Sequence, residues 1–377
     1  MSLVLTEDQE SIQRAARAFV QAKLPITQLR ALRDRHDPVG FSREAWREMA
    51  ALGLVGVTIP EAYGGGGLGF AELGFVLEEC GRTLAPTPLV SSVVLGATAL
   101  VLAGTSAQKE AHLPAVSAGE RILAFAHEEK TRHARFAIAT RAERVASGWR
   151  ITGEKTMVAD GHVADVLVVV ARTSGAASER AGLRLFLVPR ELPGVHVEKL
   201  TLIDSRNAAR VRFEGVTIPA TDVLDDAGEG LLDAVLDRAA VALSAEMLGG
   251  AIEAFERTVA YLKTRQQFGV PIGSFQALKH RAAQMFCEIE LTKSIVLEAL
   301  RAIDEGRADL PVLASAAKAR ATDTFLLVAN EAIQMHGGIG VTDELEIGFF
   351  LKRARVAEMT FGDAAYHRDR YARARGY

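Results

Sequence analysis

The chain has 377 residues, 49% of them apolar and 24% charged, so it can bury one large core or divide into two or three domains. A net charge of −3 and a pI near 6.3 give no long-range attraction to nucleic acid or to an anionic membrane. The two cysteines, Cys80 and Cys287, lack the spacing of metal ligands, so we expect no disulfide framework and no metal site. A reducing, cytoplasmic compartment fits best.

The first third of the chain is predicted to be helical. Glu7–Val20 and Ser42–Leu52 carry apolar residues three and four positions apart, and Ser42 is a good residue to begin a helix. The first residues are acidic where a signal peptide would be basic, which predicts mature protein. The apolar run Val93–Ala103 is shorter than the roughly 20 residues that span a bilayer, so we expect a buried helix and no membrane insertion.

Between residues 119 and 225 the pattern becomes strand-like. Short runs rich in β-branched and aromatic residues are separated by Gly, Ser, Asp and Pro; they are Ile122–His127, Trp149–Val158, Val163–Ala171, Leu183–Val188 and Val195–Lys199. Such runs predict an antiparallel sandwich or small barrel. The chain is therefore predicted to be an α+β protein with an N-terminal helical domain (1–118), a β domain (119–225) and a C-terminal helical bundle (226–377).

The last third predicts long helices around a four-helix bundle. Leu278 begins a series of apolar residues, ending at Ile303, that alternates steps of four and three. A second long helix is expected to start near Asp309 and to end at Gly337 and Gly338 through a left-handed cap.

A polar corner is predicted between two of these helices. Gly269 and Pro271 forbid continuation of the helix that ends near Arg265, and Ser274 is expected to cap the next one. An Arg, two amides and an aromatic ring at one corner can hold a flat, anionic ligand, because a guanidinium binds phosphate oxygens bidentately and a ring offers a stacking face. The alternative is a solvated turn in a helical hairpin.

Two motifs in this region resemble the carboxyl-terminal signature of acyl-CoA dehydrogenases. They read Arg265-x-Gln-Phe-Gly-x-Pro-Ile-x-x-Phe-Gln276 and Gln334-x-His-Gly-Gly-x-Gly340, and the order of helical, β and helical domains is similar as well. The resemblance implies an FAD cofactor and a dimer or tetramer in which the corner of one subunit touches its neighbour's flavin nucleotide. It assigns Arg265 to the pyrophosphate, Gln267 and Phe268 to the nucleotide, and Gln276, Gln334, Gly337 and Gly338 to the side facing it across the interface.

The β domain carries a further resemblance to this family. Trp149-x-Ile-Thr-Gly-Glu-Lys-Thr-Met-Val-Ala-Asp-Gly161 is similar to the strand pair beside the isoalloxazine ring. This implies flavin contacts at Met157, Val158 and Ala159, and it places Phe125 and His127 where relatives have a Thr-Glu-Pro-Gly segment. The alternative is the same architecture without flavin.

The base of the reaction is not at either family position. Oxidation of the Cα–Cβ bond of an acyl thioester needs a base for the α-proton and a hydride acceptor, the flavin N5. In many relatives the base is a glutamate near the carboxyl end, where this chain has Phe361. In a second group, which acts on bulky or steroid side-chain substrates, it lies on the helix before the corner, where Ala239 aligns.

Glu246 is the predicted base. It lies seven residues, about two helical turns, after Ala239 and faces nearly the same way. It is the only charge between Arg238 and Glu253, and a lone carboxylate in an apolar helix is costly to bury unless something uses it or pairs with it. The alternative is a structural carboxylate paired with an arginine or with Ser244.

Three functions stay open. The first is an FAD-dependent oxidoreductase that converts an acyl-CoA, expected to be branched, cyclic or polycyclic, to the 2-enoyl-CoA and passes electrons to an electron-transferring flavoprotein or a similar acceptor. The second is a non-catalytic or half-site subunit of a heteromeric dehydrogenase; Phe361 favours it, and so does Asp363, whose charge would repel a pyrophosphate. The third is an oxidase or monooxygenase on the same scaffold.

Overall fold

The computed structural model describes residues 5–224 and 228–377. Contacts within the chain define two units. The helical unit comprises the residues up to Ala31, Gly69–Ala85 and Ala240–Tyr377, and the sheet unit comprises Leu32–Leu68 and Pro86–Ala239. The predicted boundary at residue 225 lies outside the described residues, and the division into three domains stays a prediction.

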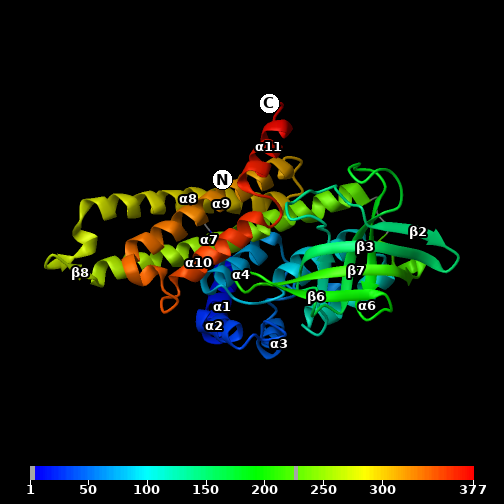
Figure 1. Cartoon of the computed structure of the whole chain (residues 1–377), viewed down its shortest axis with the longest axis horizontal. Coiled ribbons are helices and arrows are strands. Elements are labelled where there is room, and N and C mark those ends of the chain that lie inside the picture. The colour runs from blue at the N-terminus through cyan, green and yellow to red at the C-terminus, as the bar shows by residue number, and fades with distance from the viewer. Residues whose placement is uncertain (1–4, 225–227) are drawn as a thin grey trace. The chain divides into compact units, whose positions relative to one another are not determined.

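Long helices build the helical unit. They are α1 (Glu7–Lys23), α2 (Ile26–Asp34, as far as Ala31), α4 (Phe70–Thr83), α7 (Gly228–Thr264, from Ala240), α8 (Gln276–Asp304), α9 (Leu310–His336), α10 (Ile347–Met359) and α11 (Ala364–Ala374), with a 3₁₀ turn at Gly337–Val341. The helices α8 and α9 lie side by side (Figure 1). The predicted apolar series buries Met285, Ile289, Val296 and Ile303 of α8, as a helix laid along a neighbour requires.

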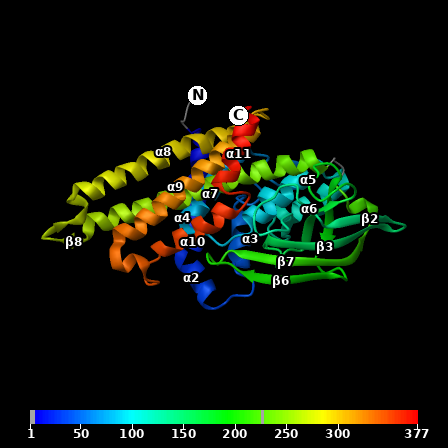
Figure 2. The ribbon, with the colours of Figure 1, turned by 45° about the horizontal axis from the view of Figure 1, so that its top comes forward.

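A seven-stranded sheet forms most of the sheet unit. Its strands are β1 (Leu123–Ala126), β2 (Arg141–Val145), β3 (Gly148–Ala159), β4 (Val166–Arg172), β5 (Leu183–Pro189), β6 (Val195–Thr201) and β7 (Asn207–Ile218). The order is β1-β4-β2-β3-β7-β6, and β5 pairs with β4; Figure 2 shows β3, β7 and β6 as neighbours. The pairings are antiparallel except those of β4 with β1 and with β2.

Helices and turns complete the sheet unit. They are α3 (Arg43–Ala51), a 3₁₀ turn at Glu61–Tyr63, a π-helical segment (Leu89–Ala97) that continues into α5 (Thr98–Ala103), α6 (Ser106–Ser117) and a 3₁₀ turn at Ala220–Asp222. The predicted buried helix at Val93–Ala103 is therefore confirmed. Among the described residues, no helix joins the length and the apolarity that crossing a membrane requires.

The five predicted strands are confirmed, and two further strands of the seven-stranded sheet were missed. The strand β2 is short and reads Arg-Ala-Glu-Arg-Val, which carries little β propensity. The strand β7 alternates buried and exposed positions from Ala209 to Glu214, a period-two signal that its arginines obscured. Both strands pair with β3, so the neighbour supplies what their composition lacks.

Of three predicted capping residues, one is confirmed and two were wrong. Ser42 caps α3, because its hydroxyl accepts from the backbone N–H of Ala45 at 3.1 Å. Ser274 does not cap α8: its hydroxyl donates to the carbonyl of Pro271, and Phe275 stands at the cap position. Gly337 ends α9 with φ 65° and ψ −141°, which is not the left-handed helical cap that we expected.

Candidate functional site

The polar corner between α7 and α8 projects from the helical unit. The strands β8 (Gln266–Gln267) and β9 (Val270–Pro271) pair as a minimal hairpin. Its turn places Phe268 and Gly269 at φ 53° and 80°. The side chain of Phe268 is 91% exposed and contacts Phe275 edge-on, with ring centroids 6.0 Å apart. A ring presented in this way has one side open to a ligand or another subunit.

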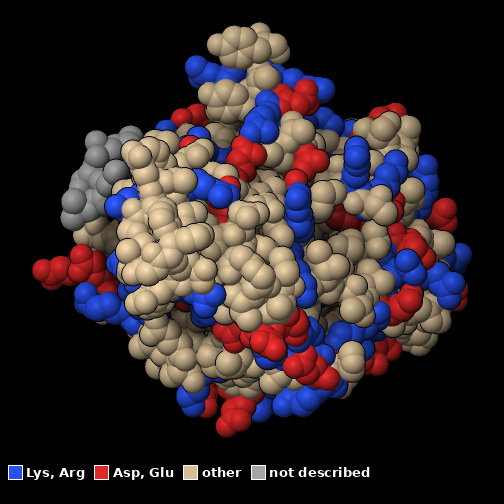
Figure 3. Space-filling view, turned by 60° about the vertical axis from the view of Figure 1, so that its left-hand side comes forward, with Lys and Arg blue, Asp and Glu red and all other residues tan. Residues whose placement is uncertain are grey.

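The predicted polar residues of this corner are on the surface. Arg265, Gln267 and Gln276 are all exposed, and within the described part of the chain Arg265 takes part in no ion pair. Figure 3 views the molecule from the side that carries β8, and residues that are neither acidic nor basic form much of the middle of that view. On α8, Phe286 and Leu291 are 52% and 56% exposed. The corner thus presents a guanidinium, amides and an aromatic ring at the surface, and α8 carries further exposed apolar side chains.

The second motif lies at the same end of the helical unit as the corner. The ring of His336, the last residue of α9, packs on Tyr261 in the last turns of α7, with centroids 4.4 Å apart. The Tyr261 hydroxyl donates to the carbonyl of His336 at 3.3 Å. Gln334 is exposed on the preceding turn, and a Cβ added at Gly337 or Gly338 would meet nothing within 4 Å. Open backbone at the same end of the unit as an exposed arginine and ring fits a nucleotide that lies along a subunit surface.

The predicted flavin residues of the sheet unit differ in accessibility. Met157 is 41% exposed with φ 53°, and it lies within a bulge of β3, where the register with β7 shifts between Lys155 and Val158. A bulge frees backbone groups from the ladder, as backbone contacts to a ligand require. Ala159 is partly exposed. The side chains of Phe125, Val158 and His127 are buried.

Glu246 lies inside the helical unit, where it is 6% exposed. Nη1 of Arg353, from α10, donates to Oε1 of Glu246 at 3.1 Å, and Arg353 is 3% exposed. Ser244 does not bond this carboxylate; its hydroxyl donates to the carbonyl of Ala240 at 2.7 Å. The carboxylate is therefore held in one orientation by an arginine 107 residues further along the chain.

The segment around the other family base position is held by a buried lysine. Nζ of Lys318, on α9, donates to the carbonyls of Ala357, Glu358 and Gly362 at 2.9–3.2 Å. Burial lowers the pKa of Lys318 to about 7. The side chain of Asp363 caps α11 by accepting from the N–H of Tyr366 at 2.8 Å, so its charge is used within the chain.

Sequence reasoning did not find Arg353 or Lys318. A signal was present for Lys318, because it is the first charge after Asp309 in an otherwise apolar helix start. Arg353 lies among other charged residues in Leu351–Arg355, and nothing in its neighbourhood marks it as buried. Both residues form hydrogen bonds with polar groups that are far away in the sequence and come close only on folding.

Comparisons with known proteins cover nearly all of the chain. The models of the acyl-CoA dehydrogenase N-terminal, middle and C-terminal domains match residues 6–120, 126–216 and 226–375. The probable acyl-CoA dehydrogenase YngJ of Bacillus subtilis is 30% identical over an alignment of 382 positions, which covers 98% of this chain and 98% of YngJ.

Two solved structures show the same architecture. A Tcur3481–Tcur3483 steroid ACAD variant has a TM-score of 0.88 at 33% identity and is covered to 98%, as is this chain. The ChsE4–ChsE5 complex from Mycobacterium tuberculosis has a TM-score of 0.90 at 27% identity, with 99% of this chain and 98% of that chain covered. The expected α+β fold is thereby confirmed. With its three domain matches and its full-length relative, the chain belongs to the acyl-CoA dehydrogenase family, whose members are FAD-dependent oxidoreductases.

Proposed function

We propose that the chain catalyses the α,β-dehydrogenation of an acyl-CoA thioester and that Glu246 takes the α-proton. The supporting observation is a carboxylate buried in α7, where the flanking residues from Val241 to Leu248 are buried as well. The Arg353 guanidinium compensates the charge that this carboxylate would carry as a base. Its fixed orientation also favours proton transfer, because the acceptor atom is already placed.

FAD, when bound, supplies the hydride acceptor. Arg265 would hold the pyrophosphate with its planar fork of N–H donors, and the Phe268 ring would cover part of the nucleotide. Both side chains are exposed, and the exposed Gln334, Gly337 and Gly338 lie at the same end of the helical unit. A second copy or a related chain would complete this site, so the working form would be a homo- or hetero-oligomer.

A half-site subunit of a heteromeric dehydrogenase is the second candidate. Two observations favour it: Ala239 and Phe361 stand at the two positions where relatives carry the base, and the Glu246 carboxylate is engaged by Arg353. The related ChsE4–ChsE5 complex is itself built of two differently named chains. Under this candidate, Glu246 is structural and the partner chain supplies the base.

A bulky acyl group is the proposed substrate. The support is the 33% identity to a protein described as a steroid ACAD, together with the loss of the carboxyl-terminal base. The proposed electron acceptor is an electron-transferring flavoprotein or a similar protein. The substrate proposal is tested by measuring the rate of flavin reduction with a panel of CoA thioesters. Branched, cyclic or polycyclic acyl groups should react faster than straight chains of equal carbon number; the reverse order contradicts the proposal.

The experiment that separates the two candidates is Glu246→Gln. This change keeps size and hydrogen bonding but removes proton acceptance, so flavin content should persist while anaerobic flavin bleaching by acyl-CoA slows by at least about 100-fold. Glu253→Gln, on the same helix, is the matched control, and a thermal melt confirms folding of both variants. If Glu246→Gln bleaches at the parental rate, Glu246 is structural. If the parental chain bleaches only after a second subunit is added, the half-site candidate holds.

A further inference from the structure

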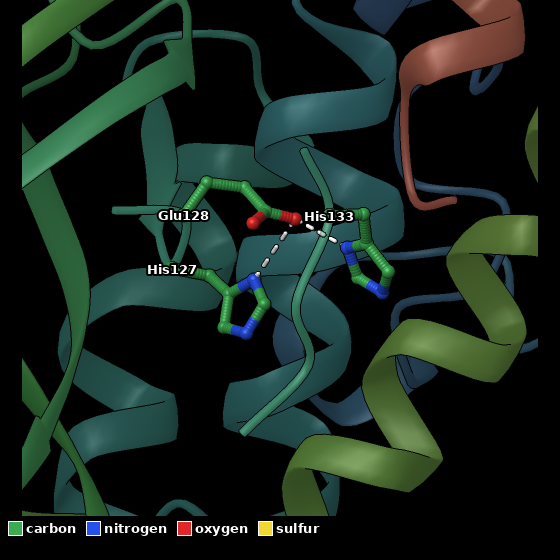
Figure 4. Close-up of side chains that lie close together, drawn as sticks. All are labelled: His127, Glu128 and His133. Carbon is green, nitrogen blue, oxygen red and sulfur yellow. Dashed lines mark hydrogen bonds and ion pairs between the residues drawn. The ribbon is translucent and has the colours of Figure 1, made fainter. Parts of the chain in front are cut away.

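Three side chains of the sheet unit converge where β1 ends. His127 and Glu128 follow β1 directly, and His133 comes from the loop that leads toward β2. Figure 4 shows both imidazoles turned toward the Glu128 carboxylate. Nδ1 of His127 is 3.4 Å from Oε1 of Glu128, Nδ1 of His133 contacts the same oxygen, and one ligand atom from each residue lies within 4.8 Å of the other two.

The tautomer of His127 is set by the backbone. Nε2 of His127 is 2.7 Å from the carbonyl oxygen of Arg135, and a carbonyl only accepts, so Nε2 carries a proton. In the neutral ring Nδ1 then bears a lone pair, and it faces a carboxylate oxygen that also accepts. Contact between two acceptors requires a hydrogen on one of the two groups or a cation between them.

The arrangement of His127 is one that metal-binding histidines adopt. Such histidines donate their second ring N–H to a carbonyl or carboxylate, which fixes the ring and the tautomer. The 3.4 Å between the His127 nitrogen and the Glu128 oxygen also matches the edge of a tetrahedron whose metal–ligand bonds are about 2.0–2.1 Å long. Two imidazoles and one carboxylate form a donor set that zinc takes in enzymes, with a fourth position for water.

The fold holds these residues in place without a metal. On β3, Nζ of Lys155 donates to the carbonyl of His127 at 3.1 Å, and the N–H of Thr156 donates to the carbonyl of Glu128 at 2.8 Å. The side chains of His127 and His133 are 4% and 2% exposed, and that of Glu128 is 19% exposed. Little conformational entropy is therefore left to lose on binding.

The nearby positive charges are compensated. Nη1 of Arg135 lies 2.5 Å from Asp233 and 2.9 Å from Asp237, and Nζ of Lys155 lies 2.6 Å from Glu129. Each cation thus has its own carboxylate, and Glu128 remains for the cluster. Repulsion of a divalent ion is correspondingly reduced.

We propose that His127, Glu128 and His133 bind one divalent transition-metal ion of the zinc class. The ion takes the position of the hydrogen between His133 and Glu128, and the proton displaced from Nδ1 of the neutral His133 ring moves to its Nε2. The ion would tie the loop that carries His133 to the end of β1. Because the His127 side chain would then bind the ion, only the backbone of His127 could contact a flavin. The spacing did not predict this site, because His-Glu followed after four residues by His is not a familiar metal-binding motif.

Metal titration of the full-length protein tests the proposal. The protein is stripped with a chelator, dialysed and titrated with Zn²⁺ by calorimetry and, separately, with Co²⁺ by visible absorption. One ion per chain should bind, with the ligand-field spectrum of a four- or five-coordinate Co²⁺. His133→Gln and Glu128→Gln should each weaken Zn²⁺ binding by at least about 100-fold, the upper range for loss of a supporting residue.

The matched control is His196→Gln, an exposed histidine beside Glu214 in the same unit, and it should bind as the parent does. Circular dichroism shows whether each variant is folded. The Co²⁺ spectrum of the unaltered protein decides the matter even if a variant fails to fold. Absence of that spectrum, or equal Zn²⁺ affinity in His133→Gln and His196→Gln, overturns the proposal and leaves a proton-sharing network.

Discussion

Two groups of residues in the helical unit, one at the corner and one in the interior, differ in their exposure to solvent. At the corner, Arg265 and its neighbouring amides are exposed and the Phe268 ring is 91% exposed. In the interior, Glu246 and Arg353 are 6% and 3% exposed and 3.1 Å apart. Polar groups that stay exposed, where a ligand or a subunit can bind them, lose little solvation free energy on folding. A buried charge loses its solvation, so the folded chain must supply an opposite charge or hydrogen bonds.

The contrast teaches how each group should respond to substitution. Removing one member of a buried ion pair leaves the other charge buried without compensation. The resulting loss of stability can exceed the net contribution of the pair. Removing an exposed side chain changes stability little but abolishes whatever it binds. Stability and cofactor content are therefore the two measurements that separate the groups.

The largest effect is expected from Arg353→Met. Without the guanidinium, the buried Glu246 charge is poorly compensated, and urea unfolding should show a loss of about 3–5 kcal/mol in the free energy of unfolding. Glu246→Gln in the same chain should restore a large part of this loss, because no charge is then left buried. Arg14→Met is the control, since Arg14 and Glu10 are 69% and 53% exposed and their pair should be worth less than about 1 kcal/mol. Equal losses in the two arginine variants would contradict the comparison.

A smaller, pH-dependent effect is expected at Glu78 of α4. Burial raises the pKa of this carboxyl from 4.5 to about 7, and Gln13 is its hydrogen-bond donor at 3.3 Å. Between pH 4.5 and 7 the folded chain holds a proton that the unfolded chain has lost, so stability should fall as the pH rises through this window, by up to about 1.4 kcal/mol per pH unit.

Glu78→Gln removes this penalty. The variant should gain stability over the parent at pH 8 and lose that advantage near pH 4, where the parental carboxyl is protonated in both states. Urea unfolding at pH 4 and pH 8 measures the difference in the free energy of unfolding between variant and parent, and Glu10→Gln, at an exposed position, is the control. A Glu78→Gln advantage that does not change with pH would show that burial leaves the titration of Glu78 unaltered.

The smallest effect on stability is expected at the corner. Arg265→Ala should change the free energy of unfolding of the apoprotein by no more than about 0.5 kcal/mol, because the side chain is exposed. FAD content should nevertheless fall, and the oligomer should loosen with it, since a ligand shared between subunits stabilises both. Lys263→Ala, exposed in the last turn of α7, is the control. A flavin-saturated monomer would contradict the interface assignment.

Local patterns in the sequence determined most helices, five strands and the polar corner. Ser42 begins a helix and Phe268–Gly269 makes a turn because such features depend on residues a few positions apart. The family motifs belong to this class too, since each lies within a dozen residues at one helix end. The exposed residues that we propose for cofactor binding could therefore be named from the sequence alone.

Only the tertiary structure decided which buried polar groups meet. Arg353 reaches Glu246 across 107 residues, Lys318 reaches three carbonyls around the end of α10, and β7 becomes a strand because β3 lies beside it. His133 meets Glu128 only through the path of a loop without regular structure. The spacing of residues along the chain does not predict such contacts. A buried polar group forms hydrogen bonds with the groups that tertiary packing places within about 3 Å of it.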